Sequence, residues 1–429
     1  MSMHHDSPRT CSRAARLIAA AAIVAAIAGR STATLTLQGR PDAVWVAAWG
    51  AAPDSPGPSI AGSTVRQIVR TSVAGSRVRL RLSNLFGSAP ISLGPVRVAL
   101  QASAGAIQPS SDRAVTFGGS GVVTVARGQD TLSDPVNLAL PAMARLAVTV
   151  HVPEGAGAST THDVGHQTAY FLRGDATTVA VFPAGDANAG RHFLTGVEVE
   201  AGRGAGTVVV LGDSITDGVG STPDRDARWP DALATRLQTH PSTASIAVVN
   251  AGIAGNRLLN DGKPPFVGPS TLSRFERDAL NTPGVRWIIL LHGGNDVSAA
   301  DMLTTPEDQV SAAQIIDGMK ALITRARARG IRIYGGTMLP REGVQKPFVS
   351  TDAGREKRRA VNAWIRTAGA FDGVIDFEHA LRDPARPDRL HPAFDSGDHL
   401  HPNDAGYAAM AAAVDLRLFA AEPGSGARH

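Results

Sequence analysis

The chain has 429 residues, of which 43% are hydrophobic, and it contains 45 glycines and 27 prolines. This composition is typical of a soluble globular protein with a large core, many loops and room for two or three domains. The 42 basic residues are nearly balanced by 38 acidic ones, and no dense basic stripe with interleaved aromatics occurs, so the charge pattern does not favour a nucleic-acid partner.

The amino-terminal segment, residues 1–33, has the features of an export signal. Arginines precede the apolar run Leu17–Gly29, and a small-residue cleavage pattern ends at Ala33. The run is short for a permanent transmembrane helix. We therefore expect cleavage near Ala33 and a secreted or periplasmic protein with no permanent membrane span, with an uncleaved amino-terminal anchor as the alternative.

The only cysteine, Cys11, precedes this apolar run and would be removed with the signal. The mature chain would then have no disulfide, no thiol nucleophile and no thiolate metal site. We expect its stability to depend on the hydrophobic core.

Short β patterns separated by turn residues extend over residues 42–201. The run Arg77–Leu82 alternates arginine with aliphatic residues, and Arg145–Val152 alternates in a similar way. Strands at this spacing without helical patterns predict a β-sandwich or jelly-roll-like domain. We interpret the arginine face of residues 77–82 as the solvated side of a half-buried strand, with a ligand surface as the alternative.

After a glycine-rich hinge, β and α patterns alternate over residues 206–421, and residues 422–429 are expected to form a flexible tail. The alternation predicts a three-layer α/β/α domain with a parallel sheet, whose site lies beyond the carboxyl ends of the strands. The predicted strands are Val208–Leu211, Ala247–Val249, Trp287–Leu291, Ile331–Gly335 and Gly373–Asp376, and the predicted helices are Trp229–Leu237, Ser273–Leu280, Ser311–Gly330, Ala353–Thr367 and Ala405–Ala420.

Ser214 directly follows the first of these strands, in the sequence Gly-Asp-Ser-Ile. A serine where a buried strand turns into a helix has an exposed hydroxyl, and backbone N–H groups of the helix point toward whatever binds there. Such a serine can be a nucleophile. Alternatively, Asp213 and Ser214 form an ordinary helix cap.

Polar residues at the later turns supply the other groups that serine hydrolysis needs: a base, a group that orients it, and donors for the oxyanion. His401 can be the base and Asp398 the carboxylate that orients it. The backbone N–H groups of Ser214 and Gly255 and the side-chain amide of Asn295 can be the donors. Each residue taken alone also fits a structural role in a loop or at a cap.

Together, the turns at Ser214, at Gly255, at residues 293–296 and at residues 398–402 resemble the four blocks of the GDSL, or SGNH, hydrolase family. The resemblance covers about residues 206–420 and implies a flavodoxin-like fold and ester hydrolysis through an acyl-serine. The resemblance implies that Ser214, His401 and Asp398 are the catalytic residues. It also implies that Ser214, Gly255 and Asn295 are the oxyanion donors. Ile215 stands where the family name has leucine, which is also apolar. Gly252 is the alternative to Gly255 as the glycine that donates to the oxyanion.

The amino-terminal half also has a resemblance of its own. The segments Trp45–Trp49, Thr64–Val69 and Leu82–Gly87 are similar to the β module that precedes the hydrolase domain in one exported bacterial branch of the family. This likeness implies little about the substrate.

Two residues beside the oxyanion turns, His292 and Asn256, are candidates for substrate contact, and an ordinary loop histidine is the alternative for His292. Residues on a neighbouring domain often line a site at a domain boundary. The remaining candidates have alternative roles: His162, His166 and Tyr170 either rim the site or serve the β half alone, His399 is expected to point away, and Asp296 is expected to brace its own turn.

These observations predict an exported serine esterase that removes short acyl groups, such as acetyl, from a carbohydrate or a small aryl alcohol. A lysophospholipase or thioesterase would use the same chemistry, whereas a glycan-binding envelope protein would need no complete set of serine, histidine and aspartate. We expect no cofactor and no metal, since Asp398 and His401, two of the three residues clustered with His399, are already used by the hydrolase assignment. The sequence leaves the oligomeric state open.

Overall fold

The computed structural model describes residues 43–183, 190–262, 267–302, 305–344 and 350–419. The predicted export signal at residues 1–33 and the predicted tail at residues 422–429 lie outside the described residues. Within those described, no helix is long and apolar enough to cross a membrane.

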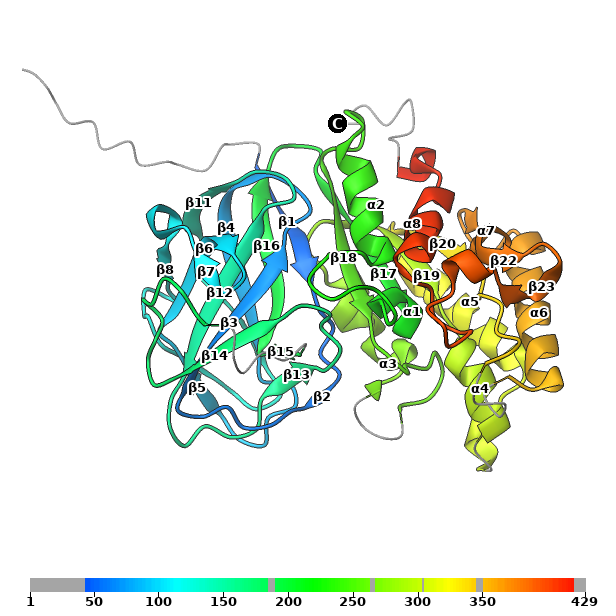
Figure 1. Ribbon diagram of the computed structural model, residues 1–429, viewed down its shortest axis with the longest axis horizontal. Coiled ribbons are helices and arrows are strands. Elements are labelled where there is room, and N and C mark those ends of the chain that lie inside the picture. Colours follow the sequence, from blue (N-terminus) through cyan, green and yellow to red (C-terminus); the bar gives the residue numbers. More distant parts are fainter. Residues whose placement is uncertain (1–42, 184–189, 263–266, 303–304, 345–349, 420–429) are drawn as a thin grey trace, which may run out of the picture. The chain divides into compact units, whose positions relative to one another are not determined.

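The β region, residues 43–201, contains two antiparallel sheets packed face to face (Figure 1). Valine and leucine side chains from both sheets meet in one hydrophobic core, as expected when alternating strands bury one face. The predicted β-sandwich is therefore confirmed. In spatial order, the first sheet comprises β1 (Val44–Gly50), β16 (Leu194–Ala201), β4 (Gly75–Ser83) and β10 (Asp130–Leu132), and β11 (Val136–Leu140) also pairs with β4. The second sheet comprises β14 (Ala169–Arg173), β3 (Ser63–Arg70), β12 (Arg145–Val152), β6 (Val96–Ser103) and β7 (Ala106–Ile107), and β8 (Arg113–Val115) also pairs with β6.

The described part of this region also contains two smaller antiparallel sheets. They are β15 (Arg191–His192), β13 (Thr160–His162) and β2 (Ser55–Pro56), and the pair β5 (Ile91–Leu93) and β9 (Val123–Val125).

One face of β4 carries ion pairs instead of freely solvated arginines. Arg77 pairs with Glu200 of the neighbouring strand β16, and Arg79 and Arg81 both pair with Glu198, at 2.6 and 2.7 Å. The two glutamate side chains are buried, while the arginines stay partly exposed. The strand is half-buried, as predicted. Its arginine face is not simply solvated, because carboxylates of the adjacent strand neutralise the arginines.

The α/β region, residues 206–419, is built on a parallel five-stranded sheet. Numbered along the chain, its strand order is 2-1-3-4-5, the flavodoxin-like order, which confirms the predicted fold class. The topological switch point lies between the first and third strands. The strands, in spatial order, are β18 (Ile246–Gly252), β17 (Gly206–Gly212), β19 (Val285–Leu291), β20 (Arg332–Gly336) and β21 (Val374–Ile375).

Helices cover both faces of this sheet, because successive strand residues point to opposite sides. Val208 and Val210 of β17 pack with α2, α7 and α8, whereas Val209 and Leu211 pack with α3, α5 and α6. The helices are α1 (Ser214–Asp217), α2 (Trp229–Gln238), α3 (Thr271–Phe275) with a following π-helical turn (Glu276–Leu280), α4 (Gly294–Met302), α5 (Ala312–Ala328), α6 (Asp352–Thr367), α7 (Phe377–Leu381) and α8 (Asp404–Ala413), and the hairpin β22 (Arg382–Asp383) and β23 (Arg386–Leu390) lies between α7 and α8 in the chain.

The closing helix is shorter than the predicted Ala405–Ala420. Helix α8 ends at Ala413, and Val414 is extended, with φ −75° and ψ 116°. Arg236 of α2 donates hydrogen bonds to the carbonyl oxygens of Ala411 and Val414. These bonds satisfy carbonyls that a helix end leaves without partners. Because Arg236 is distant in sequence, the local pattern contained no sign of this end.

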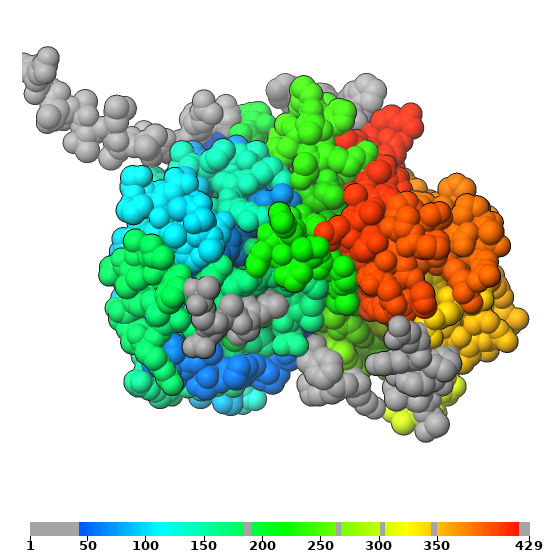
Figure 2. All heavy atoms as spheres, in the orientation of Figure 1, coloured from blue at the N-terminus to red at the C-terminus, as the bar shows by residue number. Residues whose placement is uncertain are grey.

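The two regions pack against each other along β18. Strand β1 runs beside β18, and the Ser72 hydroxyl contacts both the N–H and the carbonyl of Val248, at 3.0 and 3.4 Å. Ala47 and Ala52 of the β region join the core of the α/β region. In Figure 2 the green surface around α2 lies between the cyan β region and the red segment of α8.

Candidate active site

The carboxyl ends of the three neighbouring strands β18, β17 and β19 are level with one another. Gly212 of β17 is paired with Gly252 of β18 and with Leu291 of β19. The turns that follow therefore emerge at one edge of the sheet, at its topological switch point. Ser214 is on the first of these turns, and the other two predicted oxyanion donors, Gly255 and Asn295, are on the turns that follow β18 and β19.

Ser214 is the first residue of the short helix α1. The side chain of Asp213 caps the helix by accepting the N–H of Ile215 at 3.1 Å. Asp213 therefore supplies the ordinary cap, which leaves the Ser214 hydroxyl free for another role. Within the described residues, the backbone N–H of Ser214 has no hydrogen-bond partner.

Ser214, His401 and Asp398 form a continuous hydrogen-bonded chain. The Ser214 Oγ lies 2.8 Å from Nε2 of His401, and Nδ1 of His401 lies 2.5 Å from Oδ2 of Asp398. The structure thus brings the three predicted catalytic residues together in the order hydroxyl, imidazole, carboxylate. The hydrogen-bonded triad is open to solvent at Asp398, because the Asp398 side chain is 44% exposed, whereas that of His401 is 13% exposed.

The loop that carries the histidine and the carboxylate is held by its own backbone. Asp398 Oδ1 accepts the N–H groups of Leu400 and His401, at 2.9 and 2.8 Å, and a β-bridge joins Asp395 to Pro402. Burial acts to raise the pKa of Asp398, but the hydrogen bonds from His401 and Leu400 outweigh it and hold the pKa well below its usual range. The carboxylate is therefore ionised at neutral pH, as an orienting group must be.

The two glycines proposed as oxyanion donors differ in what their N–H groups do. Gly252 donates to Oδ1 of Asn250 at 2.9 Å, and a Cβ at Gly252 would lie 2.4 Å from the backbone nitrogen of Asp217. Gly252 is thus required for the close approach of β18 to α1. Gly255 has a φ of +75°, and its N–H meets no partner among the described residues. This difference favours Gly255 as the donor.

Asn295, in the first turn of α4, has its amide held in a fixed direction. Its Nδ2 donates to the carbonyl oxygen of Asn256 at 2.9 Å, which leaves a second N–H on the same nitrogen for an oxyanion. Asp296 accepts the N–H groups of Leu258 and Leu259, at 2.8 and 3.0 Å. Asp296 therefore braces the segment that follows the Gly255 turn and also bonds its own backbone N–H, as predicted.

Comparison with known proteins places this arrangement in a family. Residues 210–409 match the family described as GDSL-like lipase/acylhydrolase. The α/β region therefore contains a GDSL-like lipase/acylhydrolase domain. The resemblance seen in the sequence is thereby confirmed at family level.

Several solved structures are similar to this acylhydrolase fold. They include a variant of an acetyl xylan esterase from Geobacillus stearothermophilus, with 24% identity and a TM-score of 0.38, and a GDSL-like lipase from Bacteroides thetaiotaomicron, with 20% identity and a TM-score of 0.36. Each comparison covers 50% of this chain, and 95% and 87% of the other chain, respectively. No curated protein matches the chain in sequence.

His292 is a buried support of the acylhydrolase site. Its Nδ1 accepts the N–H of Gly293 at 2.9 Å, and its Nε2 lies 2.8 Å from the Thr271 hydroxyl. Burial, together with the charge of Arg274, lowers the pKa of His292 to about 3, so the ring is neutral. The side chain is enclosed by protein, which favours a structural role for His292 over the candidate substrate contact.

Asn256 is likewise buried, and its side chain is occupied by protein partners. Its Nδ2 donates to the carbonyl oxygens of Val267 and Pro269, at 2.7 and 2.9 Å, and its Oδ1 accepts from Nε of Arg274 at 3.1 Å. Asn256 therefore shapes the site through its backbone carbonyl, which holds Asn295, and its side chain does not face a substrate.

Two buried arginines that the sequence patterns did not single out also support the acylhydrolase strand ends. Arg274 donates to the carbonyl oxygens of Ala251 and Gly212, at 2.8 and 3.3 Å. Arg341 donates to the carbonyl oxygen of Gly294 at 2.8 Å. An arginine in a helical or loop pattern is ordinarily exposed, so only the folded arrangement reveals these roles.

The remaining candidates from the sequence, three histidines and Tyr170, lie in different surroundings. His399 is half exposed and pairs with Asp395, so it points away as predicted. His162 reaches across the boundary between the two regions, with Nε2 3.0 Å from Oδ1 of Asp217. Burial is the main cause that lowers the pKa of His166 to about 4. Tyr170 lies in a separate hydrophobic cluster of the β region and does not rim the site.

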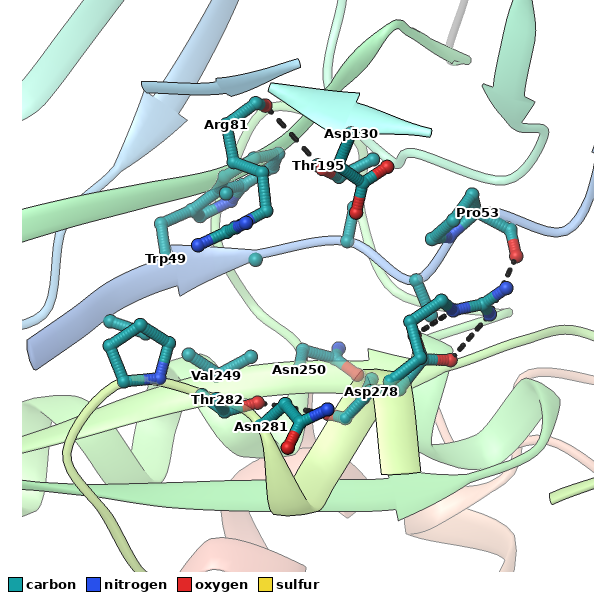
Figure 3. A pocket seen from close by; sticks show the side chains of 18 of the residues that line it. Trp49, Pro53, Arg81, Asp130, Thr195, Val249, Asn250, Asp278, Asn281 and Thr282 are labelled. Atoms are coloured by element: carbon teal, nitrogen blue, oxygen red, sulfur yellow. Dashed lines mark hydrogen bonds and ion pairs between the residues drawn. The ribbon is translucent and has the colours of Figure 1, made fainter. Parts of the chain in front are cut away.

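A cavity of about 390 Å³ lies between the two regions, but it is not the catalytic cleft. Figure 3 shows Trp49 and Arg81 of the β region on one side and Asn250 and Asn281 of the α/β region on the other. The triad does not line this cavity. In the part of the chain that the structure describes, no group of three or more acidic, histidine or cysteine side chains could hold a metal ion.

Proposed function

We propose that this protein is an exported serine esterase that cleaves carboxylic esters through an acyl-serine intermediate. The observation that carries the proposal is the hydrogen-bonded chain from Ser214 through His401 to Asp398, with distances of 2.8 and 2.5 Å, within an acylhydrolase-family fold. The N–H groups of Ser214 and Gly255, which have no partner in the described part of the chain, supply candidates for the second requirement, donors for the oxyanion. Export rests on the arginine-flanked apolar run Leu17–Gly29.

The geometry suits a two-step mechanism. His401 Nε2 takes the proton of the Ser214 hydroxyl as its oxygen attacks the ester carbonyl carbon, and ionised Asp398 stabilises the imidazolium that forms. The same histidine then gives the proton to the leaving alcohol, which departs as the acyl-serine forms. A water molecule, activated by His401, attacks the acyl-serine and releases the acid.

The oxyanion of each tetrahedral intermediate would be held by three donors. The N–H groups of Ser214 and Gly255 have no partner among the described residues, and Asn295 has one amide N–H left after its bond to Asn256. Donors already aligned in the resting protein stabilise charge as it develops, without reorganisation during the reaction.

We infer short acyl groups as substrates, such as acetyl carried on a carbohydrate or a small aryl alcohol. The support is the open end of the triad, where Asp398 is 44% exposed. An open rim admits an alcohol that is much larger than the acyl group. A lysophospholipase or thioesterase would share the chemistry but prefer a longer or different acyl donor.

The mechanism is tested by hydrolysis of p-nitrophenyl acetate. We expect Ser214→Ala to lower kcat by at least about 10⁴-fold, because no other group supplies the nucleophile. The matched control is Ser88→Ala, at an exposed serine of the β region, which should leave kcat unchanged. Full activity of folded Ser214→Ala, or no labelling of the wild type by a fluorophosphonate, would reject the serine mechanism.

The substrate class is tested separately, with p-nitrophenyl esters from acetate to decanoate and then with acetylated polysaccharides. We expect kcat/KM to be highest for acetate and to fall with chain length. A maximum at long chains would replace the short-acyl assignment by a lipase or lysophospholipase, while leaving the role of Ser214 intact.

A further inference from the structure

His162, on β13 of the β region, is a buried cation that faces the acylhydrolase region. Its side chain is 5% exposed. Nδ1 lies 2.9 Å from the carbonyl oxygen of Ala52, and Nε2 lies 3.0 Å from Oδ1 of Asp217 and 3.1 Å from the carbonyl oxygen of Val164. Carbonyl and carboxylate oxygens only accept, so both ring nitrogens must donate and the ring is doubly protonated.

Two carboxylates compensate this buried charge. Asp217 accepts directly from Nε2, and Oδ2 of Asp54 lies 3.6 Å from Nδ1. A buried charge without such partners would be strongly destabilising. The cation, its two carboxylates and the Ala52 carbonyl therefore form one unit that spans the boundary between the regions.

Asp217 connects this unit to the catalytic machinery. It is the last residue of α1, the helix that Ser214 begins. While one carboxylate oxygen receives His162, the other accepts the N–H of Ala254 at 2.9 Å. Ala254 immediately precedes Gly255, whose N–H is the proposed oxyanion donor.

The turn around Gly255 depends on such an anchor. Gly255 has the left-handed φ of +75° and no side chain to fix it by packing. A hydrogen bond from the N–H of Asn256 to the carbonyl of Ile253, at 3.1 Å, closes the turn on itself. The bond from Ala254 to Asp217 ties the turn to α1, and so sets the position of the Gly255 N–H relative to Ser214.

We propose that His162 is a positioning residue for the oxyanion hole: by holding Asp217, it keeps the turn at Ala254 and Gly255 in the place where the N–H group meets the developing oxyanion. This proposal rests on the serine esterase function proposed above. It gives the β region a part in catalysis without any contact with the substrate.

Two substitutions at one position separate this role from simple stabilisation of the boundary. In His162→Asn the amide reaches the position of Nδ1, so it can bond Ala52 but not Asp217. In His162→Gln the amide reaches the position of Nε2 and can bond Asp217. Both substitutions remove the charge, so the matched pair differs mainly in the bond to Asp217.

The experiment measures kcat and KM on p-nitrophenyl acetate, with sites counted by organophosphonate titration and folding checked by Tm. We expect kcat of His162→Asn to fall by about 10- to 100-fold with KM nearly unchanged, because a displaced donor acts in the transition state. His162→Gln should recover most of the loss. If His162 only joined the regions, both variants would lower Tm alike and keep the wild-type kcat per titrated site, which would overturn the proposal.

A double-mutant cycle with Asp217→Asn tests whether the effect passes through this carboxylate. We expect His162→Asn to cost little further kcat once Asp217 is changed, since residues that act through one contact are not additive. Additive losses would reject the pathway through Asp217.

Ser214→Ala measures the activity that remains without the proposed nucleophile, and the kcat of every other variant is compared with it. Wild-type activity in Ser214→Ala would refute the serine mechanism itself, whatever happens at residue 162. An inactive Ser214→Ala together with a fully active, folded His162→Asn would refute only the positioning role.

Discussion

The two regions place their charged side chains in different parts of their sheets. In the β region, Arg79 and Arg81 lie on the face of β4 and are matched by Glu198 of the next strand. In the α/β region, the polar groups gather where the strands end, and the N–H groups of Ser214 and Gly255 are left without partners in the described chain. Charges that neutralise each other across strands stabilise a fold, whereas donors without partners at strand ends are available for a substrate.

The comparison leads us to expect that changes at strand ends alter turnover, while changes within the sheets of the β region alter stability at most. His162 is the exception, because it belongs to the β region and contacts Asp217 of α1. Four experiments test this contrast, and they follow in decreasing order of the change that we expect.

The largest effect is expected for Asn295→Ala, which removes one oxyanion donor. We expect kcat on p-nitrophenyl acetate to fall by about 10²–10³-fold with a smaller change in KM. The control is Asn137→Ala, at an exposed asparagine of β11, which should be neutral. An unchanged kcat in Asn295→Ala would remove this residue from the oxyanion hole.

The next effect is expected for Gly252→Ala. The new Cβ would lie 2.4 Å from the backbone nitrogen of Asp217, so α1 must shift with Ser214. We expect a loss of about 1–3 kcal/mol in the free energy of unfolding. We also expect a fall in kcat of up to about 10²-fold from misplaced groups.

Gly157→Ala is the matched control, because a Cβ there meets nothing within 4 Å. Denaturant unfolding and steady-state kinetics measure the two effects. Wild-type kcat in Gly252→Ala would show that the close approach of β18 to α1 does not position the nucleophile.

A third, smaller effect concerns pH. Burial alone would lower the pKa of His162, but the charge and hydrogen bond of Asp217, with the charge of Asp54, raise it from 6.5 to about 9. The folded protein therefore holds this proton more tightly than the unfolded chain does. The resulting stabilisation is fully present below about pH 6.5 and is lost as the pH rises through about 9.

His162→Gln is the reference for this pH effect, because it has no titrating group at residue 162. We expect the Tm of the wild type to fall relative to that of the variant by at least about 2 °C between pH 7 and pH 10. Parallel Tm curves would contradict a charged His162. The other titratable or charged groups around His162 and Asp217, which both proteins share, include Asp54, His166, Arg228 and Arg274.

The smallest effect is expected for Arg81→Ala. Arg81 is 34% exposed, and its partner Glu198 keeps a second ion pair with Arg79. We expect a loss of about 1 kcal/mol or less in the free energy of unfolding and no change in kcat. A tenfold loss of kcat would break the contrast, because it would give a charge in the middle of the β sheet a role in turnover.

The sequence was sufficient to predict which polar groups the structure brings together at the candidate site. Ser214, Asn295 and the pair Asp398 and His401 each follow a strand or precede a helix with a strong local pattern, and strand ends of a parallel sheet meet at one edge. The choice of Gly255 over Gly252 also follows from a local turn, although its physical reason, the hydrogen bond from Gly252 to Asn250, is a feature of the fold.

The supporting residues could not be predicted in the same way. The partner of His162 is Asp217, on a different region of the chain, and short β runs carry no sign of which side chain crosses a boundary. His292 and Arg274 look like loop and helix-surface residues in the sequence, yet both are buried. Long-range packing decides such positions, and single-sequence patterns report only local periodicity.

The way in which β18 is covered has a consequence for anyone who shortens this protein. Among the described strands, β18 pairs only with β17, and its outer side is met by Ser72 and by β1. Cutting the chain at the glycine-rich hinge would leave a bare strand edge, with free backbone N–H and C=O groups beside valine side chains. Exposed edges of this kind recruit strands from other chains. The β region therefore acts as a cap against aggregation, and the isolated catalytic region is expected to self-associate.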